Sequence, residues 1–216
     1  MADIENQYRY TAEDEEAMEM VKQNPGYSHD LWSSEVLQAL RSNIRRFYRN
    51  EQRGVCSFCK NEISLQAAAN CTIEHIIPKS KCLEFMFHPK NLCVICADCN
   101  QIKRDQEIIN ELPNVLNDNR QRIRYPTASR TFKIVHPHFD IWDEHIIRLG
   151  RGYIDKSKKG GNTILICNLN RFFHFFDVGE EYIADADLSE LMNEYLTCGR
   201  PIRKAEILLQ IKAALR

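Results

Sequence analysis

Four cysteines form two C-x-x-C pairs, the spacing that holds a tetrahedral zinc ion. The first pair is Cys56 and Cys59, and the second is Cys96 and Cys99. Each short turn can present two thiolates to one ion, so two turns complete a shell of four sulfur ligands. A zinc ion with such a shell has no open position for catalysis. We therefore expect a structural zinc ion, and any chemistry must come from the residues that it holds in place.

A second set of polar residues lies between the two cysteine pairs and directly after them. It consists of Glu74, His75, Asn91 and Asn100. Imidazole titrates near neutral pH and can serve as a general base, while carboxylate and amide oxygens bind hard dications such as Mg²⁺ or Mn²⁺. A histidine on an apolar strand can instead be a buried structural residue bonded to a backbone carbonyl. The position of His75 between the pairs favours a catalytic site.

These residues resemble the motif of the HNH endonucleases, whose active site is of the ββα-metal (His-Me finger) type. The resemblance rests on E-H-I-I-P at 74–78, on N-L at 91–92, and on C-A-D-C-N-Q-I-K at 96–103. It covers roughly a quarter of the chain, as a set of motif matches. Asn100 stands where many members carry a third histidine, so the chain is similar to an H-N-N variant.

The resemblance implies a metal-dependent endonuclease that hydrolyses nucleic-acid phosphodiester bonds and leaves 5′-phosphate and 3′-hydroxyl ends. His75 would act as the general base, and Glu74 and Asn100 would hold one Mg²⁺ or Mn²⁺ ion. Asn91 would orient His75 by fixing its loop. The neutral amide of Asn100 should bind a metal ion more weakly than imidazole or carboxylate. DNA and RNA (tRNA included) are not distinguished, because both contain the phosphate that is attacked.

Basic residues concentrate around this motif. Residues 41–133 contain sixteen Lys and Arg against nine Asp and Glu, whereas residues 1–31 and 177–194 are acidic. In a helix expected over about 33–50, arginines recur every four residues, and their positive charges repel one another. Phosphates, or acidic side chains elsewhere in the fold, would offset this repulsion. The candidates for phosphate contact are Arg41, Arg45, Arg49, Lys103 and Arg104. A zinc-ribbon module that uses the arginine row to bind nucleic acid without catalysis is the alternative function.

The expected fold class is α+β, with a zinc-stapled ββα-metal core between a helical N-terminal region and a mixed α/β C-terminal extension. We divide the chain into residues 1–50 (N-terminal region), 51–113 (nuclease core) and 114–216 (extension). β-Branched residues predict strands at 71–77 and 91–95 in the core, since such residues favour extended backbone. Adjacent strand residues point to opposite faces, so Glu74 and His75 can share a site only if the strand twists or bulges.

The remaining elements are predicted from caps, turn residues and apolar periodicity. Helices are expected at 12–23 (with Thr11 as N-cap), from Asn100 to Pro113, at 187–196 and at 201–215, and a hairpin turn at 158–162. We assign structural roles to His88 and to the histidine-rich segment 136–145. The phenylalanines of 172–176 are expected in the core or at a partner interface.

Residues 163–171 (T-I-L-I-C-N-L-N-R) and the Gly-Gly before them are similar to the C-terminal extension of certain HNH proteins. These proteins are encoded beside an ATPase in Septu-type and retron-linked anti-phage systems. The similarity implies an ATPase protein partner that restrains the nuclease until infection and docks on the acidic ends and the aromatic cluster. The chain itself lacks G-x-x-x-x-G-K-[ST], so we do not expect it to hydrolyse ATP.

Composition indicates a globular protein of the cytoplasm, with 44% hydrophobic and 27% charged residues. No apolar run approaches the ~20 residues that span a bilayer, and the N-terminus lacks a secretory signal pattern. We expect no membrane partner. The five cysteines outside the two pairs are expected to be reduced, because an odd set among apolar neighbours does not suit a disulfide framework.

Overall fold

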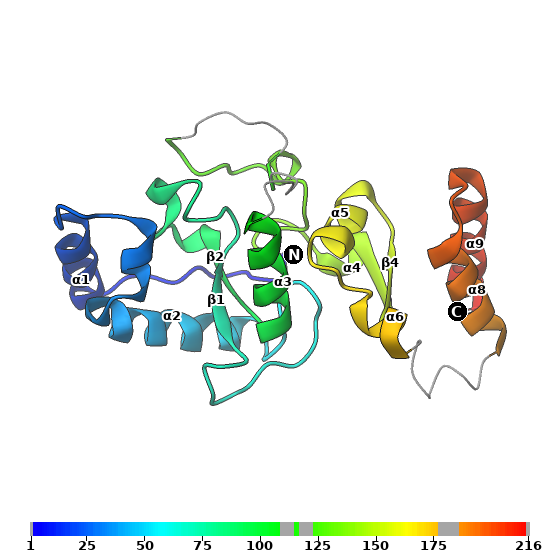
Figure 1. The fold of residues 1–216 in the computed structure, drawn as a ribbon, viewed down its shortest axis with the longest axis horizontal. Coiled ribbons are helices and arrows are strands. Elements are labelled where there is room, and N and C mark those ends of the chain that lie inside the picture. Colours follow the sequence, from blue (N-terminus) through cyan, green and yellow to red (C-terminus); the bar gives the residue numbers. More distant parts are fainter. Residues whose placement is uncertain (1, 109–114, 117–122, 177–185, 215–216) are drawn as a thin grey trace. The chain divides into compact units, whose positions relative to one another are not determined.

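The computed structural model describes most of the chain (Figure 1). The described ranges are 2–108, 115–116, 123–176 and 186–214. For residues 104–108 and 186 only the backbone is described. Among the described residues, every helix is too short or too polar to span a bilayer.

The chain forms two compact units, residues 1–142 and residues 143–216. Helices occur together with two small antiparallel sheets, which confirms the expected α+β class. The N-terminal region expected at 1–50 and the core expected at 51–113 both belong to the first unit. The two units are considered separately below.

The first unit begins with helix α1 (Ala12–Lys22), whose start matches the predicted cap. The hydroxyl of Thr11 accepts a hydrogen bond from the backbone N–H of Asp14, and the Asp14 carboxylate accepts one from the N–H of Thr11. This reciprocal capping box satisfies two helix-terminal donors that would otherwise lack partners. Carboxylates in the first turn add a favourable interaction with the helix dipole.

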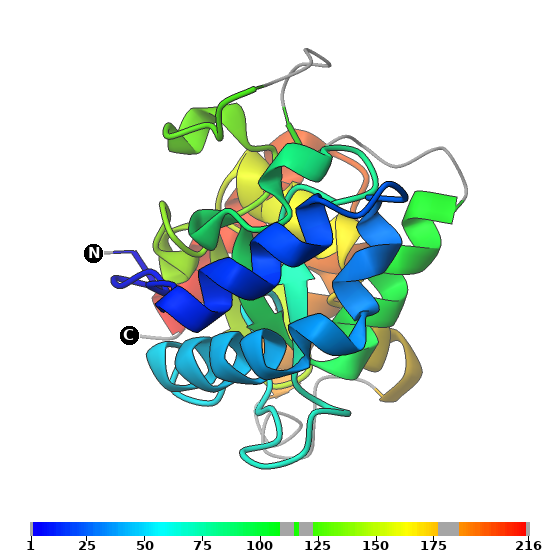
Figure 2. The same ribbon diagram turned by 90° about the vertical axis from the view of Figure 1, so that its left-hand side faces the viewer.

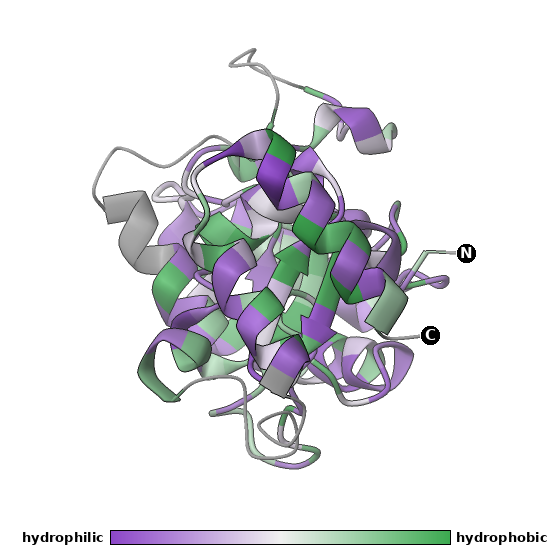
Figure 3. Ribbon diagram, turned by 90° about the vertical axis from the view of Figure 1, so that its right-hand side faces the viewer, coloured by the Kyte–Doolittle hydropathy of each residue, from purple (hydrophilic) through white to green (hydrophobic). Residues whose placement is uncertain are grey.

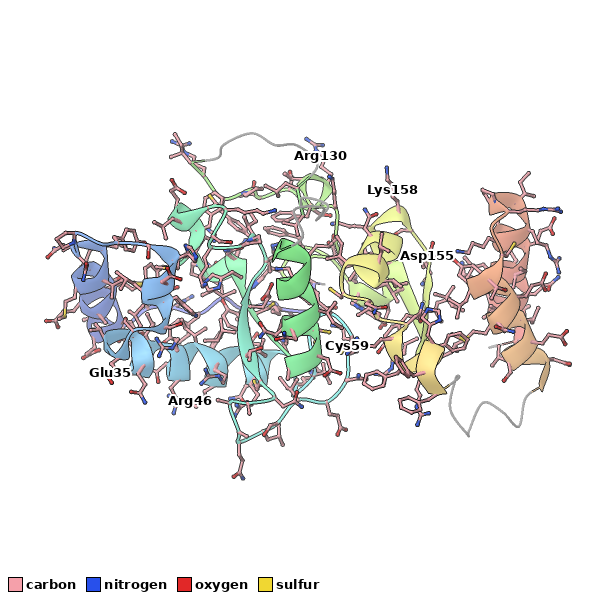
Figure 4. All side chains as sticks on the ribbon, viewed as in Figure 1. Glu35, Arg46, Cys59, Arg130, Asp155 and Lys158 are labelled. Atoms are coloured by element: carbon pink, nitrogen blue, oxygen red, sulfur yellow. The ribbon has the colours of Figure 1, made fainter. Side chains whose placement is uncertain are left out.

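Helix α2 (Gln38–Glu51) follows two short 3-10 turns, η1 (His29–Ser33) and η2 (Glu35–Leu37). Its buried side chains recur every four residues and are Leu40, Ile44 and Tyr48. That stripe faces the core, as in an amphipathic helix. Helices α1 and α2 lie side by side (Figure 2), and α2 packs on the sheet of this unit. Arg46 projects from the exposed side of α2 (Figure 4).

The sheet of the first unit is an antiparallel pair, β1 (Thr72–His75) and β2 (Leu92–Ile95), in which His75 lies opposite Leu92. Helix α3 (Ala97–Ile108) follows β2 directly and packs on β1, giving the order strand, strand, helix (Figure 1). The helix begins three residues before the predicted Asn100. The reason is local, because the Cys96 sulfur accepts a hydrogen bond from the Cys99 N–H, as an N-cap side chain does.

In the first unit, His136, His138 and Asp140 of the histidine-rich segment are buried and form a polar network, in agreement with the predicted structural role. The Tyr125 hydroxyl lies 2.8 Å from His136 Nε2 and donates to the carbonyl of Lys90. Asp140 accepts a hydrogen bond from the His136 N–H at 2.7 Å. His138 Nε2 lies 2.8 Å from the carbonyl of Leu92, in β2. The network thus supports the backbone on both sides of Asn91.

The second unit contains the hairpin β3 (Ile146–Leu149) and β4 (Gly152–Asp155), preceded by α4 (Trp142–His145). The other helices among its described residues are α5 (Lys158–Ile166), α6 (Arg171–Phe176), α8 (Ala186–Thr197) and α9 (Pro201–Ala214). Figure 3, which faces this unit, shows hydrophobic and hydrophilic residues alternating along its helices. Their apolar residues form a core around Ile154, Met192 and Ile207.

The predicted hairpin turn at 158–162 is wrong, because these residues form the first half of α5. Ser157 caps the helix by accepting a hydrogen bond from the Gly160 N–H at 3.1 Å. A Cβ atom at Gly160 would lie 2.0 Å from the carbonyl oxygen of His145. The glycine is therefore needed for close packing of a helix against the chain, and the hairpin turn occurs instead at Gly150, whose φ is +53°.

The phenylalanines of α6 have different environments. Phe173 is buried in the core of the second unit, whereas Phe175 and Phe176 are exposed by 83% and 59%. The guanidinium of Arg151 lies over the ring of Phe176 at 5.5 Å. The acidic stretch at 177–185, which the sequence suggested as part of a docking surface, lies outside the described residues.

Candidate functional site

The two cysteine pairs meet in the first unit to form one buried cluster. The sulfur atoms of Cys56, Cys59, Cys96 and Cys99 all lie within 4.8 Å of one another. Cys59 (Figure 4) and Cys96 have their sulfur atoms 3.7 Å apart. A tetrahedral zinc site with Zn–S bonds of about 2.3 Å has sulfur–sulfur edges of about 3.8 Å. The cluster therefore fits a structural zinc ion with four sulfur ligands.

Local backbone geometry presents the first pair. Residues 56–60 form a tight turn, in which the Lys60 N–H donates to the Cys56 carbonyl at 3.0 Å and Lys60 takes a positive φ of 57°. A β-bridge between Val55 and Glu62 closes the base of this turn. The second pair belongs to the start of α3, so a bound ion would join this turn to the helix that carries Asn100.

Most of the predicted site residues line one cavity of about 490 Å³ in the first unit. They are Glu74, His75, Asn100, Lys103, Arg41 and Arg45. Sequence analysis missed the opposite wall, which includes Trp32 and Asp30 from η1, and it missed Lys79 after β1. The only signal for Trp32 in the sequence was its place just before an amphipathic helix. Arg104 has an undescribed side chain and lies outside this comparison.

His75 is buried, yet it is one of the residues that line the cavity. Its Nε2 lies 3.0 Å from the carbonyl oxygen of Met86. A carbonyl oxygen can only accept, so Nε2 carries the proton in the neutral ring and Nδ1 keeps the lone pair. Burial, together with the positive charges of Lys79 and Lys103, lowers the pKa of His75 to about 3, although the hydrogen bond to Met86 acts in the opposite direction. The imidazole is thus neutral near pH 7, and in this state it is a weaker base than an imidazole whose pKa lies near that pH.

The ring of His75 is also fixed by an aromatic neighbour. Trp32 meets it edge to face, with ring centroids 4.6 Å apart and an interplanar angle of 83°. The sequence offered two interpretations of His75, a buried residue bonded to a carbonyl and a catalytic base. The first interpretation describes Nε2, which lies 3.0 Å from the Met86 carbonyl. That bond does not use Nδ1, so the catalytic role stays a prediction.

Asn91 is fully buried and ties the strand end to the loop before β2. Its Oδ1 accepts a hydrogen bond from the Ile77 N–H at 2.7 Å. Its Nδ2 donates to the carbonyls of Ile77 and Phe85, both at 3.0 Å. Phe85 precedes Met86, whose carbonyl holds the His75 ring. Asn91 therefore braces the backbone on which the orientation of His75 depends, without lining the cavity itself.

Glu74 and Lys103 form a buried ion pair at the cavity wall. The Lys103 ammonium donates to Glu74 Oε1 and, at 3.1 Å, to the backbone carbonyl of His75. The Lys103 residue is only 3% exposed. The sequence suggested that Lys103 either contacts phosphate or lies in solvent, but its ammonium is held inside the protein. Glu74 and His75 both reach the cavity because His75 is the last residue of β1.

The arginines of the predicted row differ in whether their guanidinium groups bond to backbone carbonyls. Arg41 donates to the carbonyls of Trp32 and Ser34 at 2.5 and 2.7 Å, and Arg49 donates to the carbonyl of Leu65. These two guanidinium groups thus stabilise backbone. The Nε of Arg45 is buried and has no hydrogen-bond partner among the described residues. Arg45 lines the cavity, so it is the best placed of the three to meet an anion.

Glu74 and Asn100 offer one carboxylate and one amide oxygen on the same cavity. This donor set suits a hard dication such as Mg²⁺, which keeps several of its waters. The ammonium of Lys103 already neutralises the carboxylate, however. Within the described ranges, the four cysteines are the only group of three or more Cys, His, Asp or Glu side chains close enough to hold a metal ion.

We expect acid to destabilise the first unit through His138, independently of catalysis. Burial lowers the pKa of His138 to about 4, whereas an unfolded histidine titrates near 6.5. Between these values the unfolded state binds the extra proton, so stability is complete above about pH 6.5 and falls as the pH drops toward 4. Uptake of one proton by the unfolded state lowers the free energy of unfolding by at most about 1.4 kcal/mol per pH unit.

Urea unfolding at several pH values between 5 and 7, with zinc in excess, measures this effect. Both tryptophans, Trp32 and Trp142, lie in the first unit, so their fluorescence reports its unfolding. His138→Gln should show a smaller loss of stability with falling pH than the wild type. His174→Gln, which changes an exposed histidine of the second unit, is the control and should match the wild type. Equal slopes for His138→Gln and wild type would contradict the assignment.

Comparison of the chain with models of known protein families finds no match, and comparison with curated proteins finds no similar sequence.

Proposed function

We propose that the protein is a metal-dependent endonuclease that hydrolyses nucleic-acid phosphodiester bonds, with His75 as the general base. One observation carries the proposal. A neutral imidazole, fixed through Nε2, lines the same cavity as a carboxylate, an amide and the cationic side chains of Arg45 and Lys79. A base beside several positive groups suits attack on an anionic ester.

In this proposal, the motif residues and their neighbours at the cavity have defined tasks. Nδ1 of His75 takes a proton from water while the water oxygen forms a bond to phosphorus. The bond from phosphorus to the 3′ oxygen breaks, and the 3′ oxygen takes a proton from a second water molecule to become the 3′-hydroxyl. Arg45 and Lys79 offset the charge of the phosphate. A dication held by Glu74 and Asn100 would stabilise the charge that develops on the phosphoryl and leaving oxygens. Asn91 and Trp32 keep the imidazole in place.

The test is incubation of the purified chain with supercoiled plasmid and with tRNA, in Mg²⁺, in Mn²⁺ and in chelator. We expect metal-dependent cutting of at least one polymer. The cut ends should accept label from polynucleotide kinase only after phosphatase treatment, because they carry 5′-phosphate. If neither polymer is cut, even with the partner supplied, while both are bound, the protein is a zinc-ribbon binding module instead.

We also propose an ATPase protein partner and a role in anti-phage defence, which rest on the resemblance described above. The second unit offers exposed apolar side chains where such a partner could dock, and these are Phe175, Phe176, Ile202 and Leu209. Cutting should therefore be measured both with the chain alone and with the product of the neighbouring gene, because a partner that restrains the nuclease would lower the rate.

Arg45→Ala is expected to weaken nucleic-acid binding more than Arg46→Ala. The two arginines are neighbours on α2, but Arg45 lines the cavity while Arg46 is exposed and bonded to Asn43. Loss of one phosphate contact should raise the dissociation constant for all sequences alike and reduce the salt dependence of binding by about one ion. Fluorescence anisotropy with a labelled oligonucleotide, in a His75→Ala background that prevents cutting, measures both quantities. Equal effects of the two substitutions would contradict a role for Arg45.

A further inference from the structure

We propose that Lys103 is a resident counter-ion that closes the dication site, and that a divalent ion binds at Glu74 only when the Lys103 ammonium leaves. This inference rests on the proposed function, since it concerns the same carboxylate. It adds a property that the resemblance does not imply, namely that the free protein binds dications weakly because its own cation occupies the site.

The contacts of Lys103 show how the site is closed. Its ammonium donates to Glu74 Oε1 and to the carbonyl of His75. Both partners belong to the end of β1, while Lys103 belongs to α3, so the pair also joins the helix to the strand. A dication and an ammonium on one carboxylate repel each other, and this repulsion is strong where water is largely excluded. Binding of one therefore opposes binding of the other.

Asn100, the second predicted ligand of the dication, lies beside Lys103 on the same helix. Asn100 lies three residues before Lys103 on α3, and residues at this spacing are neighbours on a helix surface. Both line the cavity with Glu74. An ion between Glu74 and Asn100 would thus lie next to the ammonium. Once displaced, the ammonium could turn into the cavity that Lys103 lines, where a substrate phosphate would accept a hydrogen bond from it.

The pairing has an energetic consequence for the resting protein. A buried carboxylate without a cation is unfavourable, and Lys103 removes that cost when no metal ion is bound. Substrate phosphate should then favour metal binding, because it stabilises the displaced lysine. By linkage, the metal ion should strengthen binding of phosphate to the same degree.

Titration of the zinc-loaded protein with Mn²⁺ tests the proposal without any measurement of cutting. Free Mn²⁺ is counted by electron paramagnetic resonance. We expect Lys103→Met to bind Mn²⁺ about tenfold more tightly than the wild type or better, within the range of coupled equilibria. The double variant Lys103→Met with Glu74→Gln should lose this binding, because the carboxylate is the ligand.

Two further variants separate displacement from a general charge effect and from misfolding. Lys79→Met removes another lysine of the same cavity that has no hydrogen bond to Glu74 among the described residues, and it should change Mn²⁺ affinity much less. Lys103→Gln keeps hydrogen-bond donors at this position and should also tighten binding. Unchanged or weaker Mn²⁺ binding by folded Lys103→Gln, or equal tightening by Lys79→Met, would overturn the proposal. If the variants show these Mn²⁺ affinities but the protein cuts no nucleic acid, the proposed function is refuted and the inference about Lys103 stands.

Discussion

Cys96→Ser is expected to abolish zinc binding and to unfold the first unit. The cluster joins the turn at 56–60 to the start of α3, segments that are separated by about forty residues of chain. Burial raises the pKa of the Cys56 thiol well above its usual value. Thiolates within 4.8 Å of one another repel, so a cation is needed to hold the four cysteines together as thiolates. Structural zinc contributes an apparent 10–16 kcal/mol in small zinc domains, roughly as much as the whole stability of a domain.

Metal analysis and tryptophan fluorescence measure both parts of this prediction. The wild type should contain one zinc per chain and lose its cooperative unfolding transition in strong chelator, and Cys96→Ser should lack both zinc and transition. Cys82→Ser is the matched control, because Cys82 lies in the same unit but outside the cluster. A wild type that holds no zinc and unfolds identically with and without chelator would rule out the structural ion.

His75→Ala is expected to lower the rate of phosphodiester cleavage by about 10²- to 10⁴-fold, the usual contribution of a general base. The fold should persist, because the bond from Nε2 to the Met86 carbonyl is one contact among many and His75 is not part of the four-cysteine cluster. Binding of the oligonucleotide should change little. Single-turnover cleavage under saturating protein gives the rate, and zinc content with tryptophan fluorescence verifies the fold.

His174→Ala provides the comparison for this substitution, since His174 is an exposed histidine of the second unit. It should cleave like the wild type. If His75→Ala instead retains the wild-type rate, then the imidazole is the buried structural residue that its Nε2 contact also describes, and another group must activate water.

Features set by short-range sequence signals were predicted well. The two C-x-x-C pairs meet in one cluster, Thr11 caps α1, and both strands of the ββα order appear within one to two residues of their expected bounds. The cap and the strands depend on residues a few positions apart in the sequence. The cysteine cluster follows from a spacing that is typical of zinc ligands. The motif residues Glu74, His75 and Asn100 also line one cavity, whereas the part contributed by Trp32 and Asp30 was not predicted.

Features that depend on distant partners were not predicted. The burial of Lys103 requires Glu74, 29 residues earlier in the chain, and a basic residue on a helix usually indicates exposure. Arg41 and Arg49 bind backbone carbonyls of preceding and following loops, which the four-residue periodicity cannot show. The Gly-Gly pair suggested a turn, but Gly160 is there because a helix passes close to the His145 carbonyl.

The central claim is that the imidazole of His75 itself transfers the proton during phosphodiester hydrolysis. Rescue of His75→Gly by free imidazole tests it most directly, because the substitution leaves a ring-sized space beside Trp32 and Met86. With the zinc-loaded variant, added imidazole should restore Mg²⁺-dependent cleavage in a saturable manner and should leave Glu74→Gln unchanged. Cleavage by His75→Gly at the wild-type rate without imidazole would contradict the claim, as would a folded variant that no concentration of imidazole restores.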